Sequence, residues 1–126
     1  MPYVDAFVLA VPKQSLEAYK AMARRSGEVW EESGALAYVE YFGDDVPYGE
    51  LTSVPRAVRA KDNEVIAFSW IVYESREQRD GANARVMADP RIQAIMSDAP
   101  FDGKRLIYAG SRRSWSCSRR AAPFDR

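Results

Sequence analysis

Two acidic residues lie in segments that are otherwise apolar. Asp5 belongs to the stretch Tyr3–Val11, and Glu40 belongs to Leu36–Phe42. Successive side chains of a strand point to opposite faces, so each carboxylate would share a face with aromatic and aliphatic side chains. If these faces line a cleft between subunits, burial would raise both carboxyl pKa values and make Asp5 and Glu40 candidate general acids or bases. The other interpretations are solvation near a strand end or an ion pair with a basic residue: Arg56, Arg59 or Lys104.

Four further residues are candidate ligand contacts. The aromatic side chains of Tyr38, Phe68 and Trp70 would offer a stacking wall to an apolar or aromatic compound. Such a set equally suits a protein core or a dimer interface. Lys104 follows a turn at residues 100–103 and would meet an anionic ligand at the start of a strand, or pair with a nearby acidic residue, Asp98 or Asp102.

Composition excludes several classes of site. The 126 residues contain no histidine, which rules out His-based catalytic triads and His-ligated zinc or iron. The single cysteine, Cys117, cannot form an intrachain disulfide, and it is expected to be a poor nucleophile because it lacks a histidine partner. We find no phosphate-binding glycine loop and no metal-ligand cluster, and therefore predict no cofactor and no metal.

Charge and hydropathy limit the partners. The formal net charge is zero, but residues 112–126 carry five arginines against one aspartate, so the rest of the chain is acidic. An acidic body argues against a nucleic-acid partner. No apolar run approaches the length of a membrane span, and the N-terminus has no signal-peptide pattern. We expect a cytoplasmic protein with neither a nucleic-acid nor a membrane partner.

The hydrophobic pattern predicts strands and helices in the order β-α-β-(short α)-β-α-β, with a further short helix before the last strand. Strands are expected at Tyr3–Val11, Leu36–Phe42, Glu64–Tyr73 and Lys104–Ala109, and helices at Lys13–Ser33, Thr52–Ala60, Ser75–Ala88 and Pro90–Met96. This order indicates an α+β, ferredoxin-like fold, β-α-β-β-α-β, with helices on one face of an antiparallel sheet.

The stretch Glu64–Tyr73, EVIAFSWIVY, is apolar on both of its faces. That pattern is typical of a central strand covered on both sides. The predicted helices are enough to cover one face only. The sequence therefore favours a homodimer in which a second copy covers the other face.

Several segments together resemble the YbaA-like family of uncharacterised bacterial proteins. They include YVDAFVLAVPK, GALAYVEYFGDDVP, VIAFSWIVYESREQRD and PFDGKRLIYAG, and the resemblance extends over residues 2–110. It implies the dimeric α+β barrel superfamily, in which two ferredoxin-like sheets pack face to face. Members of that superfamily include cofactor-independent monooxygenases, isomerase or decarboxylase types and binding proteins, so the fold does not determine the activity.

The resemblance ends at residue 110, which divides the chain into a ferredoxin-like domain, 1–110, and a divergent basic tail, 111–126. The tail begins SRRSWSCS. Codons for these residues can be chosen that read FEAVVVVL when shifted by one base, and this is the kind of strand that the family would continue with. We infer that the tail is a frameshifted reading of the last strand, and gene sequencing would test this. A genuinely divergent tail is the alternative.

The sequence thus predicts a small homodimer that binds an apolar or aromatic molecule in a cleft lined by the sheet. The first alternative is a cofactor-independent enzyme of the monooxygenase or isomerase type. In that case Asp5 or Glu40 would transfer the proton and Trp70 would shape the pocket. The second alternative is a structural dimer without a ligand.

Overall fold

One antiparallel sheet of four strands forms the centre of the molecule, and the computed structural model describes residues 2–117 of the chain. Strands β1 (Tyr3–Pro12) and β3 (Glu64–Tyr73) pair along all of their 10 residues. β2 (Ala37–Phe42) adds to the outer edge of β3, and β4 (Ile107–Arg112) adds to the outer edge of β1. The resulting order, β2-β3-β1-β4, is that of the predicted ferredoxin-like fold.

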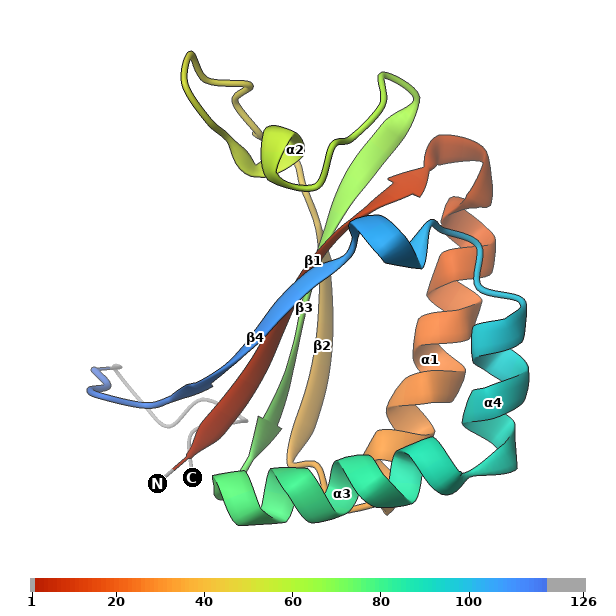
Figure 1. The fold of residues 1–126 in the computed structure, drawn as a ribbon, viewed down its shortest axis with the longest axis vertical. Helices are drawn as coiled ribbons and strands as arrows, with labels where there is room; N and C mark the ends of the chain where they lie inside the picture. Colours follow the sequence, from red (N-terminus) through yellow and green to blue (C-terminus); the bar gives the residue numbers. More distant parts are fainter. Residues whose placement is uncertain (1, 118–126) are drawn as a thin grey trace.

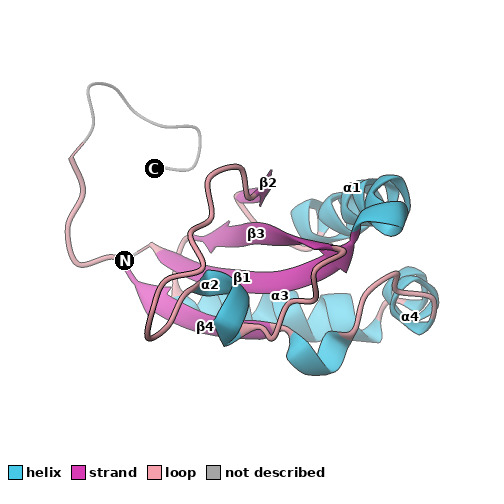
Figure 2. Cartoon of the chain, turned by 90° about the horizontal axis from the view of Figure 1, so that it is seen from above, coloured by secondary structure: helices cyan, strands magenta, loops and turns pink. Residues whose placement is uncertain are grey.

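Helices cover one face of this sheet. The helices are α1 (Leu16–Glu32), α2 (Val54–Ala57), α3 (Arg76–Ala88) and α4 (Pro90–Ser97), with 3₁₀ turns η1 (Lys13–Ser15) and η2 (Gly103–Arg105). α1, α3 and α4 lie on the same side of the sheet, whereas the short α2 lies on the opposite side near one end (Figures 1 and 2). The prediction that helices would cover one face and leave most of the other open is confirmed.

α1 buries one side of its surface against the sheet. Its buried residues recur at spacings of three and four: Tyr19, Met22, Ala23, Ser26, Val29 and Trp30. This spacing directs one side of a 3.6-residue helix at the sheet. The helix begins at Leu16 rather than Lys13, because the first three residues form a 3₁₀ turn. It ends before Gly34, whose φ of +118° favours glycine.

Short polar side chains start the other helices. The Ser53 side chain accepts a hydrogen bond from the Arg56 backbone N–H at 3.2 Å, and Ser75 accepts one from Gln78 at 3.1 Å. Both serines act as N-caps, and each satisfies an amide that the helix itself leaves unpaired.

The last strand differs from the prediction at both ends. We expected Lys104–Ala109, but β4 runs from Ile107 to Arg112. Its start is delayed because Asp102 caps a 3₁₀ turn, accepting a hydrogen bond from the Lys104 backbone N–H at 3.0 Å. Its end lies two residues beyond the predicted boundary at 110. The tail from 118 onward lies outside the described residues.

The sheet face away from α1, α3 and α4 is largely apolar, with Glu64 at one end of it, and we call it the open face. Alternation along the four strands puts these side chains on it: Val4, Ala6, Val8, Val39, Tyr41, Phe68, Trp70, Ile107, Ala109 and Ser111. One end is covered by the α2 region, where Val58 packs against Ala10 and Ile66. The remainder includes large exposed groups, with Tyr41 53% and Ile107 44% exposed.

Candidate functional site

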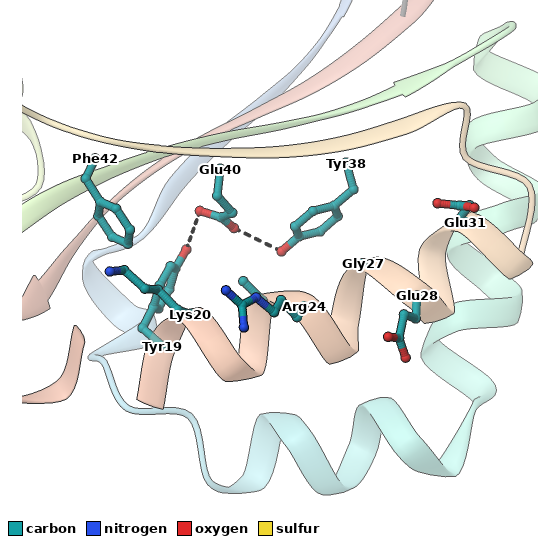
Figure 3. A pocket seen from close by; sticks show the side chains of 10 residues that line it. Tyr19, Lys20, Arg24, Gly27, Glu28, Glu31, Tyr38, Glu40 and Phe42 are labelled. Carbon is teal, nitrogen blue, oxygen red and sulfur yellow. Dashed lines mark hydrogen bonds between the residues drawn. The ribbon is translucent and has the colours of Figure 1, made fainter. Parts of the chain in front are cut away.

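Glu40 lies on the helix-covered face and receives two phenolic hydrogen bonds. The Tyr19 hydroxyl donates to Oε1 of Glu40 at 2.9 Å, and the Tyr38 hydroxyl donates to Oε2 at 3.0 Å (Figure 3). Among residues 2–117, no lysine or arginine forms an ion pair with this carboxylate. A half-buried carboxylate with neutral donors and no cation partner is available to a further hydrogen-bond donor.

The positions of these three side chains follow from the local sequence. Tyr38 and Glu40 are two residues apart in β2, so both point to the same face of the sheet. Tyr19 comes from the buried stripe of α1, which faces β2. The Tyr38 ring packs beside Gly27, where an added Cβ would lie 3.4 Å from Cδ1 of Tyr38, at ordinary contact distance.

A groove of about 520 Å³ opens between α1 and β2, with Glu40 on its wall. The aromatic part of the lining comes from Tyr19, Tyr38 and Phe42. Lys20 and Arg24 supply positive charge near Glu40, whereas Glu28 and Glu31 lie towards the C-terminal end of α1 (Figure 3). The groove thus combines stacking surface, one acceptor carboxylate and a change of charge along its length.

Burial raises the pKa of Glu40, and the hydrogen bonds from Tyr19 and Tyr38 partly oppose this rise because they favour the carboxylate. Burial and the nearby Glu40 charge raise the pKa of both tyrosine hydroxyls as well, so they remain protonated donors. A carboxyl group whose pKa is raised above its ordinary value is suited to accept or release a proton.

Asp5 occupies a different, more deeply buried environment. Its side chain faces the helices, and Nε of Arg79 in α3 lies 3.3 Å from its Oδ2. Arg79 also donates to the Tyr3 hydroxyl at 2.9 Å and lies over the Tyr3 ring. Burial raises the Asp5 pKa, while the Arg79 charge lowers it. The expected partners Arg56, Arg59 and Lys104 do not form this ion pair.

The two candidate carboxylates do not form one site. Asp5 is opposite Ile71 and Glu40 is opposite Ser69 on the intervening strand β3. Two strand spacings separate them, roughly 10 Å. Both side chains face the helices, so the condition under which they were candidates, a cleft on a face covered by a second subunit, is not met on the open face. Only Glu40 lines the groove.

The predicted aromatic wall is divided between the two faces of the sheet. Tyr38 faces α1, whereas Phe68 and Trp70 have the opposite parity in β3 and lie on the open face. There the Trp70 ring meets Tyr41 edge-on, with centroids 5.0 Å apart. The expectation that these aromatic residues line one cleft is therefore wrong, because neighbouring positions along a strand point to opposite faces of the sheet.

Lys104 is exposed in η2 and is not among the residues that line the groove. Its neighbour Arg105 forms the ion pairs of this region, with Glu64 at 2.7 Å and Asp102 at 3.0 Å. These contacts join the turn before β4 to the start of β3. Cys117 is exposed.

Sequence reasoning missed the contribution of α1 to the groove. Tyr19, Lys20 and Arg24 all lie in the predicted helix Lys13–Ser33, and none of them was a candidate site residue. The sequence did contain one signal for the groove, since Phe42 shares a strand face with Tyr38 and Glu40. That pattern could not show which helix covers β2, because the path of the chain from β1 through α1 to β2 decides it.

Comparison with known proteins identifies the family. Residues 2–103 match the family described as "Protein of unknown function (DUF1428)". The protein described as "Uncharacterized protein YbaA" of Escherichia coli strain K12 is 48% identical over 110 residues, which is 87% of this chain and 94% of that protein. The resemblance seen in the sequence is thereby confirmed.

Solved structures with low sequence identity share the fold. Rv0793 from Mycobacterium tuberculosis superposes with a TM-score of 0.59 at 12% identity, covering 94% of this chain and 100% of that one. SnoaB, a cofactor-independent oxygenase from Streptomyces nogalater, gives 0.58 at 11% identity, covering 91% and 95%. The predicted α+β, ferredoxin-like fold is confirmed. At this level of identity the likeness concerns the fold alone.

Proposed function

The chain belongs to the DUF1428 family of proteins of unknown function, and from its geometry we propose that it binds a small aromatic molecule in the groove between α1 and β2. One observation carries the proposal. Glu40 is a half-buried carboxylate on the groove wall, with two tyrosine donors and no cation partner among the described residues. Burying a carboxylate away from water costs free energy of desolvation, and a hydrogen bond donated by a ligand would offset part of that cost.

The size and lining of the groove support an aromatic ligand. A volume of about 520 Å³ lies within the usual range for small-molecule sites, roughly 300–1,000 Å³. Tyr19, Tyr38 and Phe42 provide ring surface for stacking. Because Lys20 and Arg24 already supply positive charge beside Glu40, a neutral donor such as a phenolic hydroxyl suits the carboxylate better than an ammonium group.

We further propose that a second copy of the chain covers the open face, giving a homodimer. The face is largely apolar across all four strands, its one acidic residue Glu64 is paired with Arg105 at one end, and Tyr41 and Trp70 form an edge-to-face aromatic pair on it. Exposed apolar surface of this extent marks an interaction site. Phe68 and Trp70 then serve assembly rather than ligand binding. Among the described residues, no helix combines the length and apolar character needed to cross a bilayer, and we propose a cytoplasmic location.

A second candidate function is enzymatic. Burial that raises the Glu40 pKa favours this carboxylate as the proton-transfer group of a cofactor-independent reaction. Tyr19 and Tyr38 would orient it and hold its charge. Asp5 is less suited to that role, because it is paired with Arg79 beneath α3. A binding role requires fewer assumptions and is preferred.

A thermal-shift screen against phenols, quinols and small aromatic acids tests the proposal. The variants are Glu40→Gln in the groove and, as a control on the other face, Trp70→Ala. A ligand at 100 times its Kd should stabilise the protein by about 2.7 kcal/mol. We expect hits that weaken in Glu40→Gln and persist in Trp70→Ala. No hits, or hits equally strong in Glu40→Gln, would contradict the proposal and favour a structural dimer. Turnover of a hit would favour the enzyme.

A further inference from the structure

Behind the groove lies a smaller cavity of about 80 Å³, between the sheet and the helices. Most of its wall is apolar and includes Phe7, Leu9, Met22, Ile71, Met96 and Phe101. Tyr19, Tyr38 and Glu40 line both this cavity and the groove. The two compartments are therefore neighbours, and the hydrogen-bonded Tyr19–Glu40–Tyr38 group stands between them.

The inner cavity contains a buried polar group that has no partner. The Ser26 side chain is 1% exposed, lines this cavity, and its hydroxyl makes no hydrogen bond within the described chain. A serine inside a helix can satisfy its hydroxyl by donating to the carbonyl four residues earlier. Ser26 does not, so its hydroxyl is left available in a mostly apolar wall, which also includes Ser69 and the unpaired Nε1 of Trp30. Unpaired buried hydroxyls are uncommon and call for an explanation.

Size limits what the inner cavity can hold. A cavity of about 150 Å³ is known to accommodate a benzene ring, and about 10–15 Å³ suffices for one water. At about 80 Å³ the inner cavity admits a substituent but not a ring. A ring that lies in the groove with one oxygen on Glu40 can extend only an adjacent, short substituent past the carboxylate towards Ser26.

We propose that the ligand is an aromatic ring with two neighbouring oxygen substituents, one bound by Glu40 and the other entering the inner cavity to pair with Ser26. This inference rests on the proposed function, because the ring occupies the same groove. The hydroxyl at the first oxygen donates a hydrogen bond to the Glu40 carboxylate, beside those from Tyr19 and Tyr38. The second exchanges a hydrogen bond with the Ser26 hydroxyl, which can donate or accept.

Catechol and 2-methylphenol are the matched probes, since they have nearly the same shape and differ by one hydroxyl. Calorimetry under anaerobic conditions would give the Kd of each for the wild type, Ser26→Ala and Glu40→Gln. We expect the wild type to bind catechol about five to ten times more tightly, the effect of one net hydrogen bond. Ser26→Ala should abolish this preference and leave the affinity for 2-methylphenol unchanged.

Ser26→Ala should fold, because alanine is smaller and has the highest helix propensity. It should also be at least as heat-stable as the wild type without ligand, which a purely structural role for the hydroxyl would not allow. Equal Kd values for the two probes in the wild type, or a preference that survives Ser26→Ala, would overturn the inference while leaving the groove intact. Failure of both probes to bind, or equal binding to Glu40→Gln, would instead overturn the proposed function.

Discussion

Removing the Tyr19 hydroxyl should destabilise the protein in a pH-dependent way. In Tyr19→Phe, Glu40 loses the donor at 2.9 Å and keeps only Tyr38. A hydrogen bond to a charged group contributes about 1.5–3 kcal/mol, and one between neutral groups contributes about 1 kcal/mol. Because Glu40 is half-buried and partly screened by solvent, the lower end of the charged range applies.

The sign follows from the pKa of Glu40. Burial raises it above the value of 4.5 for an unperturbed glutamate, so the wild type loses some stability as pH rises from about 4.5 through the folded-state pKa. Loss of the Tyr19 donor raises the pKa further, by roughly 1 unit for each 1.36 kcal/mol. The variant should therefore lose about 1 kcal/mol at pH 4 and about 1.5–2 kcal/mol at pH 7.

Urea denaturation at both pH values, at one protein concentration, would measure these differences, and carboxyl carbon NMR would follow the Glu40 titration. Tyr48→Phe is the matched control, because that ring is 61% exposed and remote from the groove. It should change stability little at either pH. A Tyr19→Phe effect that is the same at pH 4 and pH 7, or a Glu40 pKa that falls, would refute the reasoning.

Two further substitutions and one segment replacement test the packing of α1 and of β4. Gly27→Ala should stabilise α1 by up to ~1 kcal/mol, since the new methyl meets Tyr38 at ordinary contact distance. Urea denaturation should show a gain, and a loss would mean that the ring is displaced. Gly110→Ala should cost about 1–3 kcal/mol through overpacking, because its methyl would collide with the Tyr3 hydroxyl and Arg79; unchanged thermal stability would contradict this. Replacing residues 111–118 with FEAVVVVL should lengthen β4 and strengthen the proposed dimer, measured by sedimentation at decreasing concentration. Weaker association would argue against a frameshifted tail.

The fold was predictable because its signals are local and agree with one another. The two-faced stretch Glu64–Tyr73 became an interior strand with the predicted bounds, and the apolar stripe of α1 became its buried side. Ser53 and Ser75 are the N-caps of α2 and α3, within the ranges predicted for these helices. The last strand shifted at both ends, since the Asp102 cap and the Arg105 ion pairs outweighed the strand pattern at 104–106.

The site was less predictable because it depends on contacts between distant segments. The parity of β2 correctly grouped Tyr38 with Glu40, but nothing in the sequence showed that Tyr19, twenty-one positions away from Glu40, would donate to its carboxylate. The sequence showed that Phe68 and Trp70 share one face of β3. It did not show that the helices cover the opposite face, where Glu40 lies.

The most direct test of the account is whether Glu40 itself contacts a bound ligand. Carboxyl carbons of glutamate and aspartate can be labelled, and catechol titrated into the protein at pH 7 while their NMR signals are recorded. We predict that the Glu40 signal shifts to saturation with the Kd found by calorimetry, while the Asp5 signal beneath α3 stays fixed. Saturable binding of catechol that leaves the Glu40 signal unmoved would contradict the assignment of the groove as the binding site.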